Sequence, residues 1–131
     1  VVGGDNTNSS AVACARKTAT VPHHNSLCAG AGVFDQSYCA PFAHVLERLG
    51  TNHAWVVHGA DGLDEVSTTG KTHVAALVDG KVSEFTISPE DVGLPTARLD
   101  QLRGGDGEHN ARYLRALLEG ETGPYHDIVL F

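Results

Sequence analysis

Apolar residues recur with helical spacing in two segments of this chain. Residues 37–49 carry four of them on one helical face, and Gly50 follows at a position that suits a helix end. Residues 107–118 repeat the spacing and are followed by Gly120. The pattern predicts two amphipathic helices. Their apolar faces consist of Phe42, Val45, Leu46 and Leu49 in the first helix and of Ala111, Leu114, Leu117 and Leu118 in the second.

Other apolar runs are shorter and are typical of strands. Residues 53–58 predict a buried strand, and residues 72–78 and 82–87 flank Asp79-Gly80, which is a hairpin signal. The remaining predictions are strand segments at residues 1–2, 33–34 and 128–131, a short helix at 11–17 and a loop at 89–95. Because strands alternate with helices and one hairpin is antiparallel, the predicted fold class is α/β with a mixed sheet.

Length and charge narrow the possible functions. The 131 residues suffice for one compact domain, and 41% apolar with 19% charged content predicts a globular core. A net charge of −7 makes nucleic acid or an anionic membrane face a poor partner, and no apolar run is long enough to cross a bilayer. Cys14, Cys28 and Cys39 are odd in number and lack CxxC spacing, which fits a reducing cytoplasm rather than a disulfide framework or a zinc site.

The first candidate site is the glycine-rich segment near the start of the chain. Gly3-Gly4-Asp5 would let the backbone approach a phosphate closely, and the predicted helix at 11–17 would point free N–H groups at it. Asn8 and Ser10 could add donors to phosphate oxygens or a ligand to a metal ion. The alternative is a turn with no ligand, which is what such glycines most often form.

The second candidate is the acidic segment after the strand at 53–58. Ligand sites in open α/β sheets lie beyond the carboxyl ends of strands, and Asp64 and Glu65 follow this strand closely. Adjacent carboxylates could hold Mg²⁺, which prefers oxygen ligands and shares its shell with water and substrate phosphates. The alternative is a solvated acidic turn.

The remaining polar segments are interpreted as structural. They include residues 67–70, residues 103–106 and the pair His23-His24, for which a surface loop is expected. Trp55 and Phe34 are expected in the core rather than under a nucleobase. No Ser-His-Asp elbow, phosphate-binding Walker loop or metalloprotease helix occurs in the sequence, and no catalytic side chain is assigned.

Three runs, taken in order, resemble the signature of one enzyme family. Residues 58–70 read His-Gly-Ala-Asp-Gly-Leu-Asp-Glu-Val-Ser-Thr-Thr-Gly, and residues 89–94 and 102–106 continue the likeness. From about residue 32 to the end, the chain is similar to the anthranilate phosphoribosyltransferases. Nucleoside phosphorylases share that family's fold, and the Asp-Gly-Leu-Asp-Glu run favours the transferase.

The resemblance implies a reaction and a site. Members of the family transfer the phosphoribosyl group of phosphoribosyl pyrophosphate to anthranilate, which gives N-(5-phosphoribosyl)anthranilate and pyrophosphate in tryptophan biosynthesis. It implies Mg²⁺ as cofactor. It also implies a single phosphoribosyltransferase domain in the nucleoside phosphorylase-like fold. The implied metal ligands are Asp64, Glu65 and Ser10, and the implied substrate-binding residues are Gly3, Gly4, Asp5, Asn8 and Ser10.

The departures from the family are as informative. Ala11 stands where a Thr is usual, and residues 18–31 replace a stretch that includes the family's Lys-His-Gly-Asn segment and its anthranilate-binding Arg. The domain is therefore expected to be incomplete. It would consist of a phosphate-loop-like segment at 1–17, an irregular junction at 18–31 and a family-matching segment at 32–131, without the N-terminal helical domain.

An incomplete domain implies impaired turnover and leaves two other interpretations open. Without the N-terminal helices the family's homodimer is not expected, and without the anthranilate-binding segments turnover is expected to be very low. One alternative is a non-catalytic remnant that keeps the fold or binds phosphate and metal. The other is a pyrimidine-phosphorylase-like enzyme, which would use phosphate and need no Mg²⁺.

Overall fold

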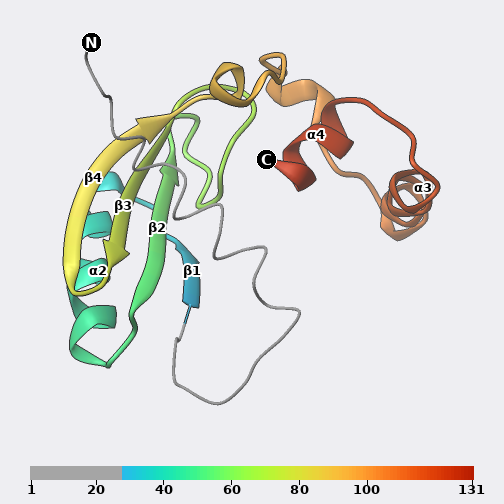
Figure 1. Ribbon diagram of the computed structural model, residues 1–131. Coiled ribbons are helices and arrows are strands. Elements are labelled where there is room, and N and C mark those ends of the chain that lie inside the picture. Colours follow the sequence, from blue (N-terminus) through green and yellow to red (C-terminus); the bar gives the residue numbers. More distant parts are fainter. Residues whose placement is uncertain (1–27) are drawn as a thin grey trace, which may run out of the picture.

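The computed structural model describes residues 28–131, which form a four-stranded sheet followed by a helical segment (Figure 1). The strands are β1 (Cys28–Gly32), β2 (His53–Gly59), β3 (Thr72–Val78) and β4 (Lys81–Ile87), and they lie side by side in chain order. β1 is parallel to β2, whereas β3 and β4 are antiparallel to their predecessors. The predicted mixed α/β sheet is therefore confirmed. The predictions for residues 1–27 lie outside the described residues.

Helix α2 (Cys39–Arg48) connects β1 to β2 and covers one face of the sheet (Figure 1). A 3₁₀ turn at Gln36–Tyr38 precedes the helix, and the Asp35 carboxylate caps this turn by accepting from the Ser37 amide at 2.8 Å. Gly50, at φ +88°, ends the helix, with the Gly50 amide bonded to the Glu47 carbonyl and the Thr51 amide to the Leu46 carbonyl. The end predicted at Gly50 is confirmed.

The sheet carries apolar side chains on both faces. Beneath α2 lies one core cluster, made of Val33, Cys39, Ala43, Val56 and Ala75. The opposite face holds a second cluster, made of Val57, Val74 and Ala76, against which Trp55, Val66, Phe85 and Ile87 pack. Trp55 meets Phe85 edge to face with ring centroids 5.6 Å apart, so its expected place in the core is confirmed.

The hairpin between β3 and β4 turns where the sequence predicts it. Asp79 and Gly80 have φ angles of 48° and 75°, which is the two-residue turn that twists with its strands.

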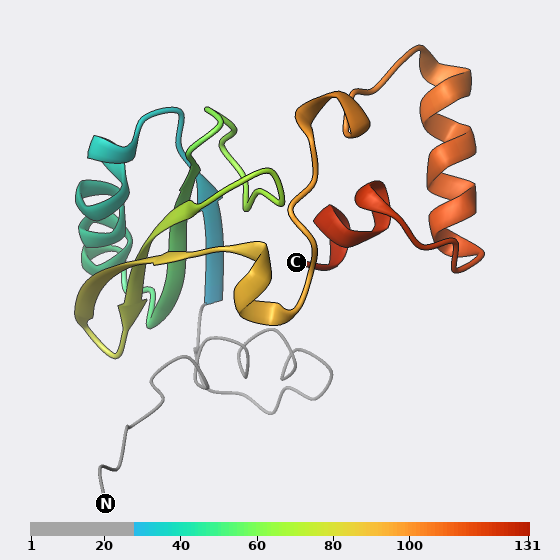
Figure 2. The ribbon, with the colours of Figure 1, turned by 90° about the horizontal axis from the view of Figure 1, so that it is seen from above.

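The two helices at the end of the chain stand apart from the sheet (Figure 2). Two 3₁₀ turns, Pro89–Val92 and Leu99–Gln101, lead to α3 (Gly107–Leu118) and α4 (Pro124–Leu130), which contact each other. α3 has the predicted bounds and is capped by the Asp106 side chain, which accepts from the His109 amide. The loop predicted at 89–95 contains the first 3₁₀ turn. None of the helices within residues 28–131 is long and apolar enough to span a membrane.

Three secondary-structure predictions are wrong. Residues 128–131 were expected as a strand, but α4 ends only at Leu130, because Pro124 occupies the first helical turn and the Asp127 amide bonds to the Gly123 carbonyl. Most of Cys28–Gly32 was expected in the irregular junction, but this segment is strand β1. Its small side chains give no strand pattern, and it is a strand because it pairs with β2. Residues 33–34, expected as a strand, instead follow β1, although the Val33 amide still bonds to the Val57 carbonyl.

The apolar face of α2 is also placed differently from the prediction. Of the four residues expected on the core side, Leu46 packs against the first cluster, whereas Phe42, Val45 and Leu49 are exposed. The small residues Cys39 and Ala43 are the buried ones, since they let the helix approach the sheet closely. Phe34, expected in the core, is 76% exposed beside Tyr38. On α3, Leu114 and Leu118 are likewise exposed.

Candidate functional site

The candidate site lies where the two parallel strands end. The loop formed by residues 60–71 joins β2 to β3 and carries Asp64 and Glu65. Because β1 runs parallel to β2, the carboxyl end of β1 at Gly32 reaches the same edge of the sheet. Two backbone bonds close the base of the 60–71 loop, from the Gly59 amide to the Leu63 carbonyl at 2.8 Å and from the Ala60 amide to the Lys71 carbonyl at 2.8 Å.

A close backbone contact joins this loop to β1. The carbonyl oxygen of Asp64 lies so near the α-carbon of Gly32 that a Cβ there would overlap it. Only glycine fits at this point. The contact fixes the backbone that carries Asp64 while leaving its side chain, and that of Glu65, exposed.

Asp61 joins the two arms of the loop by hydrogen bonds. Its Oδ1 accepts from the Leu63 amide at 3.1 Å, and its Oδ2 accepts from the Ser67 hydroxyl at 2.5 Å and from the Thr69 hydroxyl. Ser67 is fully buried, and its amide donates to Thr72 Oγ1 at the start of β3. The structural interpretation of residues 67–70 is therefore confirmed for Ser67 and Thr69, which bond to the Asp61 carboxylate.

The electrostatics of Asp61 follow from these contacts. Partial burial raises the pKa of its carboxyl, but the hydrogen bonds from Ser67, Thr69 and the Leu63 amide outweigh burial, so the pKa lies below its usual value. Asp61 is therefore ionised at neutral pH and accepts from all three donors.

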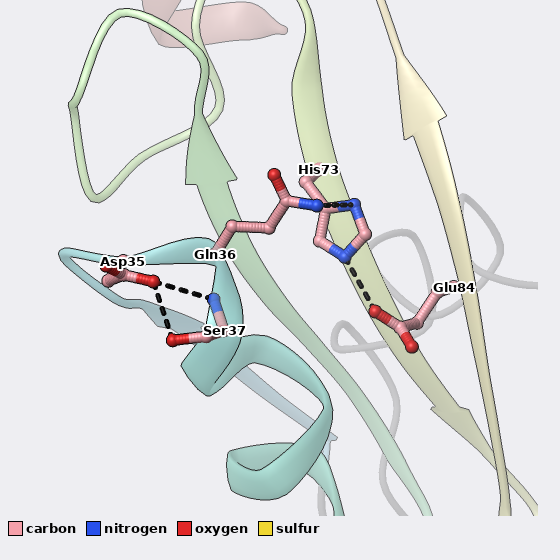
Figure 3. Close-up of polar contacts among 5 residues, drawn as sticks. All are labelled: Asp35, Gln36, Ser37, His73 and Glu84. Atoms are coloured by element: carbon pink, nitrogen blue, oxygen red, sulfur yellow. Dashed lines mark hydrogen bonds and ion pairs between the residues drawn. The ribbon is translucent and has the colours of Figure 1, made fainter.

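A second polar cluster links the turn before α2 to β3 and β4 (Figure 3). His73 stands between the Gln36 amide nitrogen, 3.4 Å from its Nδ1, and a Glu84 carboxylate oxygen, 2.8 Å from its Nε2. The register partner of His73 on β2 is His58, whose Nδ1 lies 2.9 Å from the Val33 carbonyl oxygen. These contacts hold the segment after β1 against the sheet, so we interpret their role as structural.

The predicted metal ligands fit Mg²⁺ as part of a site. Asp64 and Glu65 offer adjacent hard oxygen ligands, and neither carboxylate has a hydrogen-bond or ion-pair partner within the described part of the chain. Residues 28–131 contain no group of three or more His, Cys, Asp or Glu side chains arranged to hold a metal ion. Two carboxylates suit an ion that completes its shell with water and substrate phosphates.

The rest of the predicted site lies elsewhere in the sequence. Gly3, Gly4, Asp5, Asn8 and Ser10 fall outside the described residues, so their place beside Asp64 and Glu65 stays a prediction. A cavity of about 320 Å³ lies between α3 and α4, with Tyr113, Tyr125 and His126 in its wall, and it includes none of the predicted site residues.

The sequence interpretation missed the residues that shape the loop, namely Asp61, Gly32 and Gly59. A signal for Asp61 was present, because an Asp-Gly pair followed by hydroxyl residues is the composition of a side-chain-capped turn. The contact of Gly32 with Asp64 joins residues far apart in sequence, and no local pattern marks it.

Comparison with known proteins agrees with this arrangement. A sequence model described as "Glycosyl transferase family, a/b domain" matches residues 20–131. The anthranilate phosphoribosyltransferase of Azorhizobium caulinodans is 57% identical over 99 residues, and that of Rhodospirillum rubrum is 58% identical over 100 residues. Each match covers 76% of this chain and 29% of the relative, so the chain spans less than a third of their length.

Solved structures of similar proteins share the fold. The anthranilate phosphoribosyltransferase of Thermus thermophilus superposes with a TM-score of 0.67 at 44% identity, over 75% of this chain and 28% of that one. The enzyme of Saccharomyces cerevisiae in complex with PRPP and Mg gives a TM-score of 0.70 at 27% identity, over 79% and 30% of the two chains. With the mixed sheet and the loop that follows β2, these likenesses show that the chain belongs to the glycosyl transferase family, within its α/β domain.

Proposed function

We propose that this chain contributes to an anthranilate phosphoribosyltransferase site, in which Asp64 and Glu65 hold Mg²⁺ together with the pyrophosphate group of phosphoribosyl pyrophosphate. The observation that carries the proposal is the position of these two carboxylates, which are unpaired within residues 28–131. They lie on a fixed loop at the carboxyl ends of two parallel strands, which is where sheets of this class bind ligands. The relatives' shared name and the yeast complex with PRPP and Mg support the same assignment.

The proposed chemistry depends on charge and orientation. An acidic chain with a net charge of −7 repels a pyrophosphate, so the site needs local positive charge. When bound, Mg²⁺ would supply that charge to the departing pyrophosphate. Asp64 and Glu65 would orient the pyrophosphate through the ion, and the fixed loop would keep both carboxylates at one place relative to the reacting sugar.

The first segment of the chain has a proposed place in the same site. Gly3, Gly4 and Asp5 would cradle the pyrophosphate with backbone amides, and Asn8 and Ser10 would contact phosphate or the ion. One metal-bridged pyrophosphate can touch both segments only if they share a crevice. A distance measured between spin labels attached at positions 7 and 63 would test this, and labels on opposite edges of the sheet would contradict it.

The test of the metal site is a Mg²⁺ titration of the full chain in the presence of pyrophosphate. Asp64→Asn and Glu65→Gln should each weaken Mg²⁺ binding by about a hundredfold or more, because each removes a charged ligand. Asp79→Asn is the matched control, since Asp79 is an exposed carboxylate at the opposite end of β3 and should leave affinity unchanged. Equal affinity in all four proteins would overturn the proposal.

A turnover assay separates this proposal from its alternatives. Consumption of anthranilate fluorescence, with excess phosphoribosyl pyrophosphate and Mg²⁺, should be very slow in this chain and lost in Asp64→Asn. Mg²⁺ binding without any turnover would favour a binding remnant. Cleavage of a pyrimidine nucleoside by phosphate without Mg²⁺ would favour the phosphorylase-like alternative.

A further inference from the structure

We propose that Asp61 is a positioning residue for the Mg²⁺ site: it folds the 60–71 loop so that Asp64 and Glu65 remain outside it, and it does not itself bind the ion. The inference rests on the proposed function, because it assigns a role to a third carboxylate of the same loop. That role differs from the one that its position in the acidic run suggests.

Three donors from different parts of the loop converge on Asp61. The Leu63 amide lies two residues ahead, and the hydroxyls of Ser67 and Thr69 come from the return arm of the loop. Ser67 Oγ donates its proton to Asp61 and also accepts from the Thr69 amide at 3.0 Å. One carboxylate therefore joins both arms, and the two residues between them that face outward are Asp64 and Glu65.

The geometry leaves Asp61 little capacity for a metal ion. A carboxylate offers about four lone-pair positions, and three of those on Asp61 are occupied by the donors named above. The fourth is on Oδ1, and this oxygen lies close to the backbone of Gly59, where an added Cβ would come within 2.5 Å of it. Asp61 is thus exposed but held by three donors of its own loop, whereas Asp64 and Glu65 have no such partners within residues 28–131.

The network also requires the charged form of Asp61. Both hydroxyls donate to the same oxygen, Oδ2, so a proton there would displace one of them. The lowered pKa of Asp61 agrees with this arrangement, since the hydrogen bonds outweigh the effect of burial. Loop order and ionisation of Asp61 are therefore coupled.

The test compares variants that remove the acceptor with variants that remove its donors. Mg²⁺ affinity is measured with pyrophosphate for the full chain, Asp61→Asn, Ser67→Ala, Thr69→Val and the double variant Asp61→Asn/Ser67→Ala, with Asp64→Asn as the ligand-loss reference. Thermal unfolding confirms that each protein is folded at the temperature of the titration. Ser67→Ala and Thr69→Val keep the inference testable if Asp61→Asn fails to fold, because they leave every carboxylate in place.

A positioning role predicts intermediate and non-additive losses. Asp61→Asn, Ser67→Ala and Thr69→Val should each weaken Mg²⁺ binding by roughly tenfold, the lower end of the range for partners of metal ligands. The double variant should bind no worse than Asp61→Asn, since the donor acts only through the acceptor. If Asp61 were a direct ligand, Asp61→Asn would lose as much Mg²⁺ affinity as Asp64→Asn. Ser67→Ala and Thr69→Val would then bind Mg²⁺ like the parent. That result would overturn the inference.

Other outcomes are also decisive. If Asp61→Asn and both donor variants lower the unfolding temperature without changing Mg²⁺ affinity, Asp61 is structural only and the inference fails. If Asp64→Asn weakens binding but none of the three variants does, the inference fails while the proposed function stands. If the parent binds no better than Asp64→Asn, the proposed function fails and the inference fails with it.

Discussion

The carbonyl oxygen of Asp64 rests on the α-carbon of Gly32, and this contact joins the end of β1 to the loop that follows β2. Gly32→Ala should push the loop away, because the added Cβ would overlap a backbone atom that cannot rotate aside. We expect the free energy of unfolding to fall by about 1–3 kcal/mol and Mg²⁺ affinity with pyrophosphate to drop. Urea unfolding and the titration measure the two effects.

Gly30→Ala is the matched control, because a Cβ at Gly30 in the same strand meets nothing within 4 Å. It should change stability and Mg²⁺ affinity much less than Gly32→Ala. Equal effects of the two substitutions would show that the contact with Asp64 does not set the position of the loop.

Acid should lower the free energy of unfolding more in the parent protein than in Asp61→Asn, because only the parent has an Asp61 carboxylate to protonate. The folded pKa of Asp61 lies below its ordinary value of 3.8, so its stabilising contribution is complete above pH 3.8 and is lost as pH falls through the folded pKa. Below pH 3.8 the free energy of unfolding of the parent should therefore fall more steeply than that of Asp61→Asn. Chemical unfolding at a series of pH values measures the difference.

Asp35 and Glu90 also have pKa values below their ordinary ones, through hydrogen bonds from Ser37 and Thr96 respectively. Both are present in the parent and in Asp61→Asn, so their contributions cancel in the comparison. Parallel stability curves for the two proteins below pH 3.8 would contradict the assigned network.

A buried leucine and an exposed leucine should differ in how much stability they lose on replacement by alanine. Leu77→Ala, at a fully buried position of β3, should cost about 2–5 kcal/mol of stability because it leaves a cavity in the sheet. Leu49→Ala, at a position 72% exposed at the end of α2, should cost less than about 0.5 kcal/mol. If urea unfolding gave Leu49→Ala the larger loss, the face of α2 predicted from the sequence would be the buried one after all.

The turn between β3 and β4 should require glycine at its second position. Gly80 has φ +75° and open space around it, so Gly80→Ala should cost about 1–2 kcal/mol through backbone strain alone. Gly70→Ala is the control, since Gly70 also has open space but no positive φ. Similar stabilities of the two variants in urea would argue against the turn geometry.

Elements with strong local signals could be predicted from the sequence, and those defined by distant partners could not. The bounds of α3 follow from Asp106 before it and Gly120 after it, and the hairpin follows from Asp79-Gly80. By contrast, β1 consists of small residues with no alternation and is a strand because it pairs with β2. In α4 the run Ile128-Val129 has strand propensity, but the preceding Gly123-Pro124 starts a helix instead.

The candidate site divides in the same way. Asp64 and Glu65 could be placed after β2, because a buried strand followed by acidic residues is a local pattern. The role of Asp61 depends on hydroxyls six and eight residues away, and that of Gly32 on a contact between the end of β1 and the loop that follows β2. The helical period of α2 was predicted correctly, but its buried face was not. The face that packs on the sheet is the one with the small residues Cys39 and Ala43, which allow a close approach.

The order of the strands has a consequence for how the protein folds. Each strand lies beside its neighbour in the chain, and the hairpin of β3 and β4 and the pairing of β2 with β3 close short loops. Among the four described strands, only β1 is separated from its partner strand by a helical crossover, so we expect it to join an antiparallel nucleus late. Because the loop between β2 and β3 contacts Gly32 of β1, Asp64 and Glu65 would reach their final positions in that last step. A chain paused before the step would contain most of the sheet and still have no formed metal site.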